Sequence, residues 1–485
     1  DPDVIRVEDT YYMVSTTMHF MPGCEILQSF DLVHWEHVTY VYETLDHTDA
    51  QQLKSGQNIY GQGMWAASLR YHEGRFYICF VANDTRKTYL YTSEKIDGPW
   101  KKQLIEGFYH DGSLLFDEDG RNYIVYGNDE IWITELNEDL TAPKKDGLHR
   151  LLVSDHKNPE LGYEGSHIQK INGYYYIFLV HSLRDRWMRT EACFYSDSLE
   201  GEFTGGDVLC DDRGYCGQGV AQGGIVDTPD GKWYAMLFQD SGAVGRIPIL
   251  LPVTWKDHFP VFGQNGHVPE EIEVHSTRPG YIYQPLVGSD DFCNGLLPRW
   301  QFNHDPDPRY YHLDALQGTY TITTREVCTE LTQAVNTLTQ RMSYPSCAAE
   351  VTVDASALKE GDVAGLCALQ GCYAAVGITK HHGKYEVLML DKKEDGILDM
   401  TEGTVVESHQ MDFRLEADFC NMKDEARCYY RVNKGDWLPI GTVHKLYFKL
   451  DHFTGCRFGL FCYAAEETGG SACFRDFKYY DVDEI

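Results

Sequence analysis

Five residues whose side chains suit carbohydrate chemistry stand at matching places in the first half of the chain. They are Asp1, Trp65, Asp111, Glu164 and Gln222. Each precedes a tight-turn signal by about nine residues, roughly one strand length. Carboxylates can act as general acid and general base, and an aromatic ring can stack on the C–H face of a sugar. The matched spacing therefore predicts one shared functional site.

The elements that must position these residues recur five times. Each repeat has a turn followed by an aromatic strand. The turns are Asp9-Thr10, Glu73-Gly74-Arg75, Asp119-Gly120-Arg121, Asn172-Gly173-Tyr174 and Asp230-Gly231-Lys232. Hairpins repeated at intervals of about 45 to 65 residues are typical of propeller blades, whose innermost strands line a central axis. We therefore expect a five-bladed β-propeller in which the five residues converge on one axial pocket.

The second half of the chain lacks this repeat. Prolines and glycines predict a linker at Pro279, Gly280, Pro285 and Gly288. Short alternating strands follow from residue 290, among them TYTIT, CAAEVTVDAS, GLCALQ, AAVGITK, KYEVLML, CYYRVN and RFGLFCY. This pattern predicts an antiparallel β-sandwich. We therefore predict an all-β chain with a propeller over residues 1–283 and a sandwich over 284–485, the sandwich capping the pocket rather than catalysing.

Composition narrows the classes of partner. The chain has 485 residues and a formal net charge of −32. This charge argues against nucleic-acid and anionic-membrane partners, which need basic patches, whereas a neutral sugar remains compatible. The sequence contains no run of eighteen apolar residues of the kind that spans a membrane. The length is sufficient for two domains with substantial cores.

The fifteen cysteines include no CxxC pair. We interpret them as free thiols in a reducing, cytoplasmic compartment rather than as a disulfide framework. No signal peptide is visible. The sequence begins at Asp1 without a Met, so we expect the natural chain to extend further.

Several other polar residues have plainer interpretations. Arg246 lies among apolar residues, so it needs a carboxylate partner, for which the axial acids are available; it could equally hold a substrate hydroxyl. His167 is expected to be a packed core residue rather than a partner of the site. The charged run of Asp117, Glu118 and Asp119 is expected to be a solvated turn. His381 and His382 are expected to form a turn rather than a metal site.

Three converging carboxylates suit glycoside hydrolysis. One acid protonates the leaving oxygen, and in inverting enzymes a second carboxylate stands about 6.5–9.5 Å away, with room for a water molecule. A third carboxylate nearby should raise the pKa of the acid by like-charge repulsion. Ser-His-Asp catalysis is disfavoured because the sequence contains no GxSxG nucleophile motif.

Specific motifs then point to a family. The segments DPDVIRVEDTYYMVSTT, GQGMWAASLRY, HDGSLLFDEDGRNY, YEGSHIQKINGYYY and QGGIVDTPDGKWY resemble glycoside hydrolase family 43. This family comprises inverting β-xylosidases and α-L-arabinofuranosidases with a five-bladed propeller. The segments RWQFNHDPDPRYYHL and QAVNTLTQRMSYPSC are similar to the lectin-like, concanavalin-type sandwich appended to many members. The resemblance spans essentially the whole chain.

Residue by residue, the resemblance implies a division of labour. Asp1 corresponds to the general base, Glu164 to the general acid, and Asp111 to the acid that orients the substrate and modulates the pKa. Trp65 and Arg246 correspond to residues that hold the terminal sugar.

The sequence also departs from the family pattern. Gln222, which we place in the substrate pocket, stands where many relatives have a His associated with an axial water or calcium ion. We therefore expect no required cofactor and have no support for an axial calcium. Gly112 and Ala67 replace prolines, and both replacements could alter the shape of the pocket.

We therefore expect an exo-acting, inverting hydrolase that releases terminal α-L-arabinofuranosyl or β-D-xylosyl units from arabinoxylan-derived oligosaccharides. An endo-acting arabinanase or galactan hydrolase of the same fold would need an open groove across the propeller. A non-catalytic carbohydrate-binding propeller would bind sugars without releasing reducing ends, and it would not need three carboxylates together.

Overall fold

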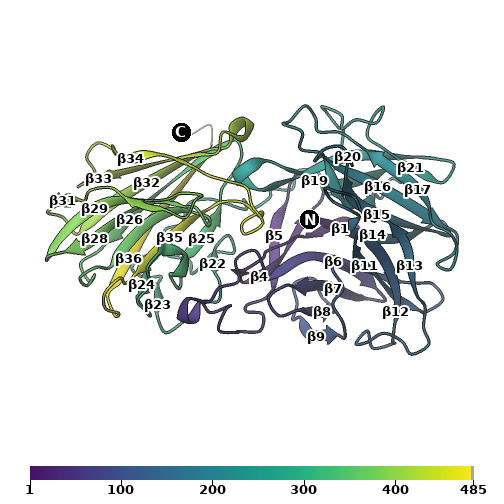
Figure 1. The fold of residues 1–485 in the computed structure, drawn as a ribbon, viewed down its shortest axis with the longest axis horizontal. Coiled ribbons are helices and arrows are strands. Elements are labelled where there is room, and N and C mark those ends of the chain that lie inside the picture. The colour runs from purple at the N-terminus through teal and green to yellow at the C-terminus, as the bar shows by residue number, and fades with distance from the viewer. Residues whose placement is uncertain (482–485) are drawn as a thin grey trace.

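The computed structural model describes residues 1–481. Two β-domains lie side by side, the propeller in purple to teal and the sandwich in green to yellow (Figure 1). Helix in this part of the chain is limited to four short turns: η1 (Lys54–Gly56), η2 (Gly242–Val244), η3 (Leu331–Gln333) and η4 (Cys420–Met422). None of the helices described is long and apolar enough to be a membrane span. The all-β prediction is confirmed.

The propeller has five blades, each a four-stranded antiparallel sheet whose strands follow one another from the axis outward. Each predicted turn joins the first two strands of a blade, which confirms the blade count. The strands, blade by blade, are β1 (Asp3–Val7), β2 (Thr10–Val14), β4 (Gly23–Ser29) and β5 (Glu36–Tyr42); β6 (Met64–His72), β7 (Arg75–Ala82), β8 (Lys87–Ser93) and β9 (Lys101–Ile105); β10 (Ser113–Phe116), β11 (Asn122–Asn128), β12 (Glu130–Leu136) and β13 (His149–Ser154); β14 (Glu164–Ile171), β15 (Tyr174–Ser182), β16 (Arg189–Ser196) and β17 (Thr204–Leu209); β18 (Ala221–Asp227), β19 (Trp233–Asp240), β20 (Arg246–Lys256) and β21 (Phe259–Phe262).

A single guanidinium group ties four blades together at the axis. Arg70, on β6, donates to the Asp3 carboxylate of β1 at 2.8 Å. It also donates to the Ser113 hydroxyl at 2.7 Å and to the carbonyls of Leu114 and Ile168 at 2.8 and 3.3 Å. Arg70 keeps 13% of its side-chain surface exposed, and these bonds fix its guanidinium group between the inner strands.

The first and last blades close the ring through apolar packing and one ion pair. A buried cluster spans the two blades and contains Val4, Tyr11, Met13, Leu32, Val226, Tyr234 and Met236. Arg6 of β1 pairs with Asp227 of β18 at the same junction. The ring is therefore closed by side chains, since every blade takes its four strands from its own stretch of chain.

One predicted turn is wrong in part. Glu118 and Asp119 are exposed as predicted, but Asp117 is buried with 4% of its surface exposed. Its carboxylate accepts hydrogen bonds from Lys170 at 2.6 Å and from the Tyr175 hydroxyl at 2.5 Å. Both partners belong to the next blade, so a local reading of the charged run could not identify them.

The sandwich consists of a nine-stranded and a seven-stranded antiparallel sheet. The strands that the sequence predicted are confirmed within these sheets. The first sheet contains β3 (Phe20–Met21), β22 (Gln301–Asn303), β25 (Leu338–Arg341), β27 (Val363–Leu369), β28 (Ala374–His381), β29 (Lys384–Lys392), β30 (Leu398–Met400), β31 (Thr404–Val406) and β35 (Arg457–Tyr463). The second contains β23 (Tyr311–Asp314), β24 (Thr319–Thr323), β26 (Ser346–Asp354), β32 (Gln410–Asp418), β33 (Glu425–Arg431), β34 (Leu438–Lys445) and β36 (Ser471–Asp481).

The two domains exchange structure. Strand β3 comes from the first blade yet pairs with β22 at the edge of the sandwich. The linker begins on the propeller, where Thr277 donates its backbone N–H to the Phe30 carbonyl at 2.7 Å. It reaches the sandwich at Gly288, whose N–H donates to the Gln340 side chain at 2.6 Å. The predicted boundary at 283/284 falls between these two contacts.

The remaining minor predictions are settled by local structure. His382, at φ 51°, occupies the turn that follows β28, as predicted, whereas His381 is the last residue of that strand, so its predicted place in the turn is wrong. The fifteen cysteines, all within the described residues, are free thiols. The reducing compartment remains a prediction.

Candidate active site

All five predicted site residues stand at or near the start of an innermost strand. Trp65, Glu164 and Gln222 lie within or at the edge of a β-bulge, where the strand slips register against its neighbour. The slips fall between Met64 and Ala67, between Glu164 and His167, and between Ala221 and Gly224. A bulge re-aims side chains locally, which lets an inner strand present them to the mouth of the axis. Asp111 reaches its place differently, through a left-handed backbone with φ 46°.

The Asp1 carboxylate is held by two groups. The Thr16 hydroxyl donates to its Oδ2 at 2.5 Å, and Arg246 pairs with its Oδ1. Only 8% of the Asp1 surface is exposed. One carboxylate oxygen is thus anchored by a neutral donor and the other by a cation, which fixes the orientation of the group. The prediction that Arg246 pairs with an axial acid is confirmed.

Arg246 is itself the centre of a charged network. Its Nε lies 3.2 Å from Asp240, which also pairs with Arg189 at 3.1 Å. The aromatic rings of Phe238 and Phe453 flank its guanidinium, with centroids 4.5 and 4.3 Å away. Burial works against the charge of Asp240, but the guanidinium groups of Arg189 and Arg246 hold its pKa below the usual value.

A second cluster joins two of the predicted acids through a histidine. His110 Nε2 lies 3.4 Å from Glu164 Oε2 and 3.6 Å from Asp111 Oδ2. Asp111 accepts the Gly165 N–H at 3.2 Å, and Glu164 accepts an N–H of Asn128 at 3.0 Å. Asp111 and Glu164 come from neighbouring blades, so the cluster is formed only when the propeller assembles.

The electrostatics of this cluster differ from the sequence-based expectation. Burial raises the pKa of Asp111, with a further contribution from Glu164. The Asp111 carboxylate raises the pKa of His110 to about 9, against the effect of burial and with help from Glu164. At Glu164, burial acts upward, but the hydrogen bond and charge of His110 hold the pKa below its usual value. The expected rise at Glu164 is therefore absent, because His110 offsets the neighbouring acid.

The sandwich contributes a residue that the sequence did not reveal. Phe453 packs its ring edge-on against Trp65, with centroids 5.5 Å apart, and covers the outer face of Arg246. Its loop is fastened by the Cys456 N–H, which donates to the Ala243 carbonyl at 2.8 Å. Gly455, at φ 101°, passes so close to the Val244 carbonyl that a Cβ would overlap it. The sandwich thus covers part of the mouth, in line with the expectation of a cap.

Gln222 lies in a more enclosed setting than the acids. Its backbone N–H donates to buried Glu191 at 2.7 Å, and its side chain packs against Gly165, where a Cβ would stand 2.7 Å from Gln222 Cγ. Burial raises the pKa of Glu191 well above its usual value. The roles of Gln222 and Trp65 in sugar binding remain predictions. His167 is a packed residue as expected, buried with its Nδ1 2.9 Å from the Gly165 carbonyl oxygen.

Within residues 1–481, one set of His and carboxylate side chains has the spacing of a metal site. The ligand atoms of His110, Asp111 and Glu164 lie within 4.8 Å of one another. In this set the imidazole of His110 lies between the two carboxylates, where a protonated ring offsets part of their negative charge.

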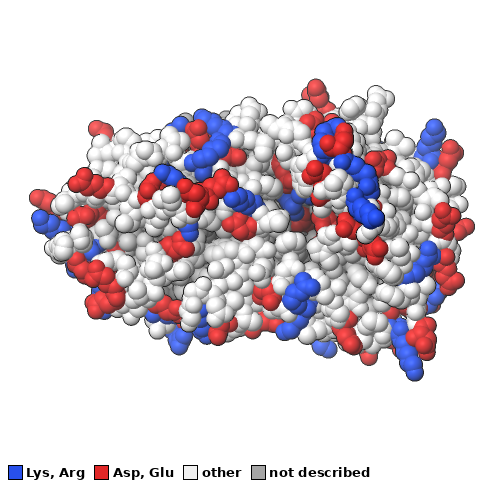
Figure 2. Space-filling view, viewed as in Figure 1, with Lys and Arg blue, Asp and Glu red and all other residues white. Residues whose placement is uncertain are grey.

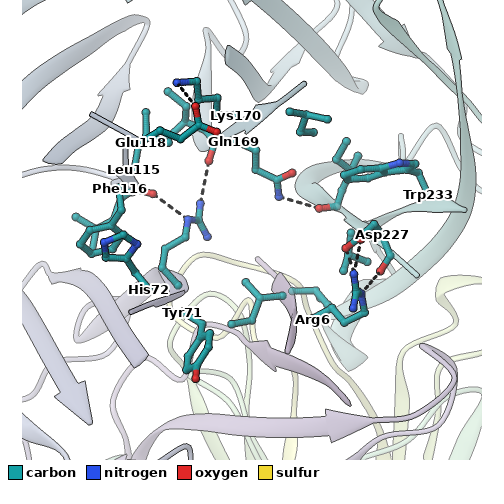
Figure 3. A pocket seen from close by; sticks show the side chains of 18 residues that line it. Arg6, Tyr71, His72, Leu115, Phe116, Glu118, Gln169, Lys170, Asp227 and Trp233 are labelled. Carbon is teal, nitrogen blue, oxygen red and sulfur yellow. Dashed lines mark hydrogen bonds and ion pairs between the residues drawn. The ribbon is translucent and has the colours of Figure 1, made fainter. Parts of the chain in front are cut away.

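The opposite end of the axis is also hollow but has a different character. A cavity of about 480 Å³ is lined there by the far ends of the same five inner strands (Figure 3). Its charged side chains pair locally, Arg6 with Asp227 and Lys170 with Glu118. None of the five predicted site residues lines this cavity. At the end of the axis where the predicted site residues lie, by contrast, charged side chains of both signs lie in the hollow between the domains, near the N-terminus (Figures 1 and 2).

The charged network yields a stability prediction. Asp240→Asn leaves Arg189 and Arg246 with one negative partner fewer in a buried place, so it should cost about 3–5 kcal/mol of unfolding free energy. Because the pKa of Asp240 is lowered in the fold, its contribution is complete above the unfolded-state pKa of about 3.9 and is lost as the pH falls through the folded value.

Denaturant unfolding of wild type and variant at pH 7 and below pH 4 checks both the size and the sign of this effect. Asp230→Asn, on an exposed turn, is the matched control and should change nothing measurable. A gap between wild type and Asp240→Asn that widens in acid would contradict the role given to Asp240.

Comparisons with known proteins agree with this geometry. The chain is 26% identical over 545 residues to a β-xylosidase of Formosa agariphila, covering 100% of this chain and 87% of that protein. It is 25% identical over 338 residues to a non-reducing-end α-L-arabinofuranosidase of Bacteroides ovatus, covering 66% and 62%. The solved structure of a bifunctional GH43-CE protein of Bacteroides eggerthii superimposes with a TM-score of 0.91 and 42% identity; it covers 99% of this chain, which spans 62% of that one.

The family models agree on both domains. The model described as glycosyl hydrolases family 43 matches residues 1–260, and the one described as the β-xylosidase C-terminal concanavalin A-like domain matches residues 289–480. The first of these covers more than half of the chain and includes every predicted site residue. The chain belongs to glycosyl hydrolase family 43, with a concanavalin A-like domain at its C-terminal end.

Proposed function

We propose that this glycoside hydrolase is exo-acting and inverting, and that it releases terminal α-L-arabinofuranosyl or β-D-xylosyl units from arabinoxylan-derived oligosaccharides. The observation that carries the proposal is the arrangement of Asp1, Asp111 and Glu164 at one mouth of the axis, with Arg246 among them. The relatives named above as β-xylosidase and α-L-arabinofuranosidase support both sugars.

The roles follow from the contacts of each carboxylate. Asp1 is oriented by Thr16 and charge-paired with Arg246, so it suits the base that takes a proton from the attacking water. Glu164 protonates the glycosidic oxygen as the C–O bond breaks, on the opposite face of the sugar. Asp111 holds a negative charge beside both Glu164 and the sugar, and it stabilises positive charge that develops on the ring in the transition state.

Exo action is supported by the cover over the mouth. Phe453 and its loop, seated on Ala243 and Val244, restrict the pocket on the side of the sandwich. A long polysaccharide passing through the site, as an endo-acting enzyme requires, would have to displace that loop. A binding protein without catalysis has no need for three partly charge-compensated acids at one point, because burying such charges is costly.

The experiment that tests the proposal compares two substrates side by side. We expect release of p-nitrophenol from the α-L-arabinofuranoside, the β-D-xyloside, or both, and the ratio ranks the two sugars. Glu164→Ala should lower the hydrolysis of xylobiose or an arabinoxylo-oligosaccharide by about 10²–10⁴-fold, the usual range for a lost general acid. Turnover like that of wild type in Glu164→Ala, with unchanged folding by circular dichroism, would refute the assignment. Silence on all substrates would favour the open-groove or binding alternatives.

We further propose that the reaction requires no metal or organic cofactor, since two carboxylates supply acid and base. Activity should therefore be unchanged after dialysis against EDTA and should not rise on addition of Ca²⁺. A loss of activity in EDTA that Ca²⁺ restores would instead support an axial ion near Gln222.

A further inference from the structure

His110 occupies a position that the roles above leave unexplained. Its imidazole lies between the proposed acid and the modulating carboxylate, 3.4 Å from Glu164 and 3.6 Å from Asp111. About a fifth of its side-chain surface is exposed, 19%. The ring also faces Trp65, with centroids 6.1 Å apart. A titratable side chain is thus in direct reach of the oxygen that must deliver a proton.

The charged groups around His110 favour a bound proton. Asp111 acts most strongly, Glu164 adds to it, and Arg86 opposes both. Against the opposing effects of burial and Arg86, the two carboxylates raise the pKa of the imidazole to about 9. Glu164 is held in its ionised form by His110 and by the more distant Arg189 and Arg246. In the free enzyme, the opposite directions of these two shifts favour a shared proton on the imidazole of His110 over the carboxylate of Glu164.

This location poses a chemical problem for the proposed acid. Glu164 must carry a proton on its carboxylate when the glycosidic bond breaks, yet its neighbour competes for that proton. We propose that His110 stores the proton that Glu164 delivers to the leaving group. The inference rests on the acid role of Glu164 proposed above and makes His110 a positioning residue for the proton rather than a catalytic residue.

The transfer balances as follows. The Nε2–H bond of His110 breaks and an Oε2–H bond forms on Glu164, which leaves a neutral imidazole and a neutral acid. As the glycosidic C–O bond breaks, that proton passes to the leaving oxygen, and Glu164 becomes a carboxylate. Asp1 takes a proton from the attacking water and releases it to solvent. His110 regains its proton from solvent before the next cycle.

Substrate binding supplies the driving force for the first step. A sugar that fills the pocket expels water from around the His110–Glu164 pair. Loss of water disfavours an ion pair relative to two neutral partners, because each charge loses its hydration. The distance of 3.4 Å is long for a hydrogen bond, and such contacts commonly shorten when the substrate is bound.

A simpler alternative predicts the opposite shift of the alkaline limb of the kcat/KM profile when His110 is removed. If His110 were only a fixed positive charge, removing it would raise the pKa of Glu164 and move the alkaline limb of kcat/KM to higher pH. If His110 stores the proton, the limb in wild type reflects loss of the shared proton near pH 9. Removing His110 then moves the limb to lower pH, since Glu164 alone must retain the proton.

The test measures pH profiles of kcat/KM for wild type, His110→Gln and His110→Phe. The substrates are xylobiose, whose leaving group needs protonation, and 2,4-dinitrophenyl β-D-xyloside, whose leaving group does not; the corresponding arabinosides replace them if arabinose is preferred. On xylobiose we expect the alkaline limb of both variants to fall by about one pH unit or more, a tenfold loss at high pH. On the dinitrophenyl glycoside both variants should follow wild type within about twofold.

His110→Gln keeps a neutral N–H donor toward Glu164, so it separates proton storage from mere positioning. The proposal would be overturned if the alkaline limb of His110→Gln on xylobiose lay at the same pH as that of wild type. It would also be overturned if the alkaline limb of either variant moved to higher pH. His72→Gln, at the far mouth of the axis, is the control and should leave the profile unchanged. Unfolding midpoints show whether each variant is folded, and His110→Gln remains interpretable if His110→Phe is not.

Glu164→Gln tells this result apart from a failure of the proposed function. If Glu164 is the acid, the variant loses activity on xylobiose but retains it on the dinitrophenyl glycoside. Equal loss on both substrates would remove Glu164 from the acid role, whatever the His110 variants show. A selective loss in Glu164→Gln combined with unshifted His110 profiles would refute only the storage of the proton.

Discussion

Buried carboxylates that face one another repel, and the site of this enzyme is built around compensating that repulsion. Arg246 pairs with both Asp1 and Asp240, and Arg189 shares Asp240. His110 likewise lies between Asp111 and Glu164 and offsets part of their repulsion. Arg246 and His110 therefore each contact two acids. This alternation of charge lets several negative groups share a small volume.

The fold makes this arrangement possible by giving each group a separate support. The proposed base, modulator and acid come from the first, third and fourth blades, and Arg70 fixes the relative position of four blades beneath them. Bulges at the starts of the inner strands turn side chains toward the mouth. The sandwich then adds Phe453 over Arg246. The contact between the Phe453 ring and Arg246 thus joins the two domains, and strand β3 joins them as well.

The sequence sufficed for features that repeat. Matching turns located the blades, and equivalent strand positions located Asp1, Asp111 and Glu164, because symmetry-related places in a propeller share one axis. The Gly–Pro-rich linker and alternating strands likewise indicated the sandwich. The family motifs carried the assignment of roles, which no count of spacings could supply.

Features that depend on distant contacts could not be read in this way. Phe453 lies in a loop of the second domain, and nothing in its own neighbourhood indicates a place beside Arg246. Asp117 appeared to belong to a solvated turn because its partners are on the next blade. The predicted rise in the pKa of Glu164 was wrong for a similar reason, because His110, which lowers that pKa, belongs to another blade. His110 is adjacent to Asp111 in sequence, but its contact with Glu164 forms only when the neighbouring blade packs against it.

We propose that Asp1 and Glu164 act on opposite faces of the sugar in a single displacement. Proton NMR of the first product formed tests it most directly, before mutarotation mixes the anomers. We expect α-D-xylose as the first product of a β-D-xyloside, or β-L-arabinofuranose from an α-L-arabinofuranoside, because water attacks from the side opposite the leaving group. Release of the anomer with the substrate's own configuration would contradict it, since retention requires a covalent glycosyl intermediate on a carboxylate that acts here as a base.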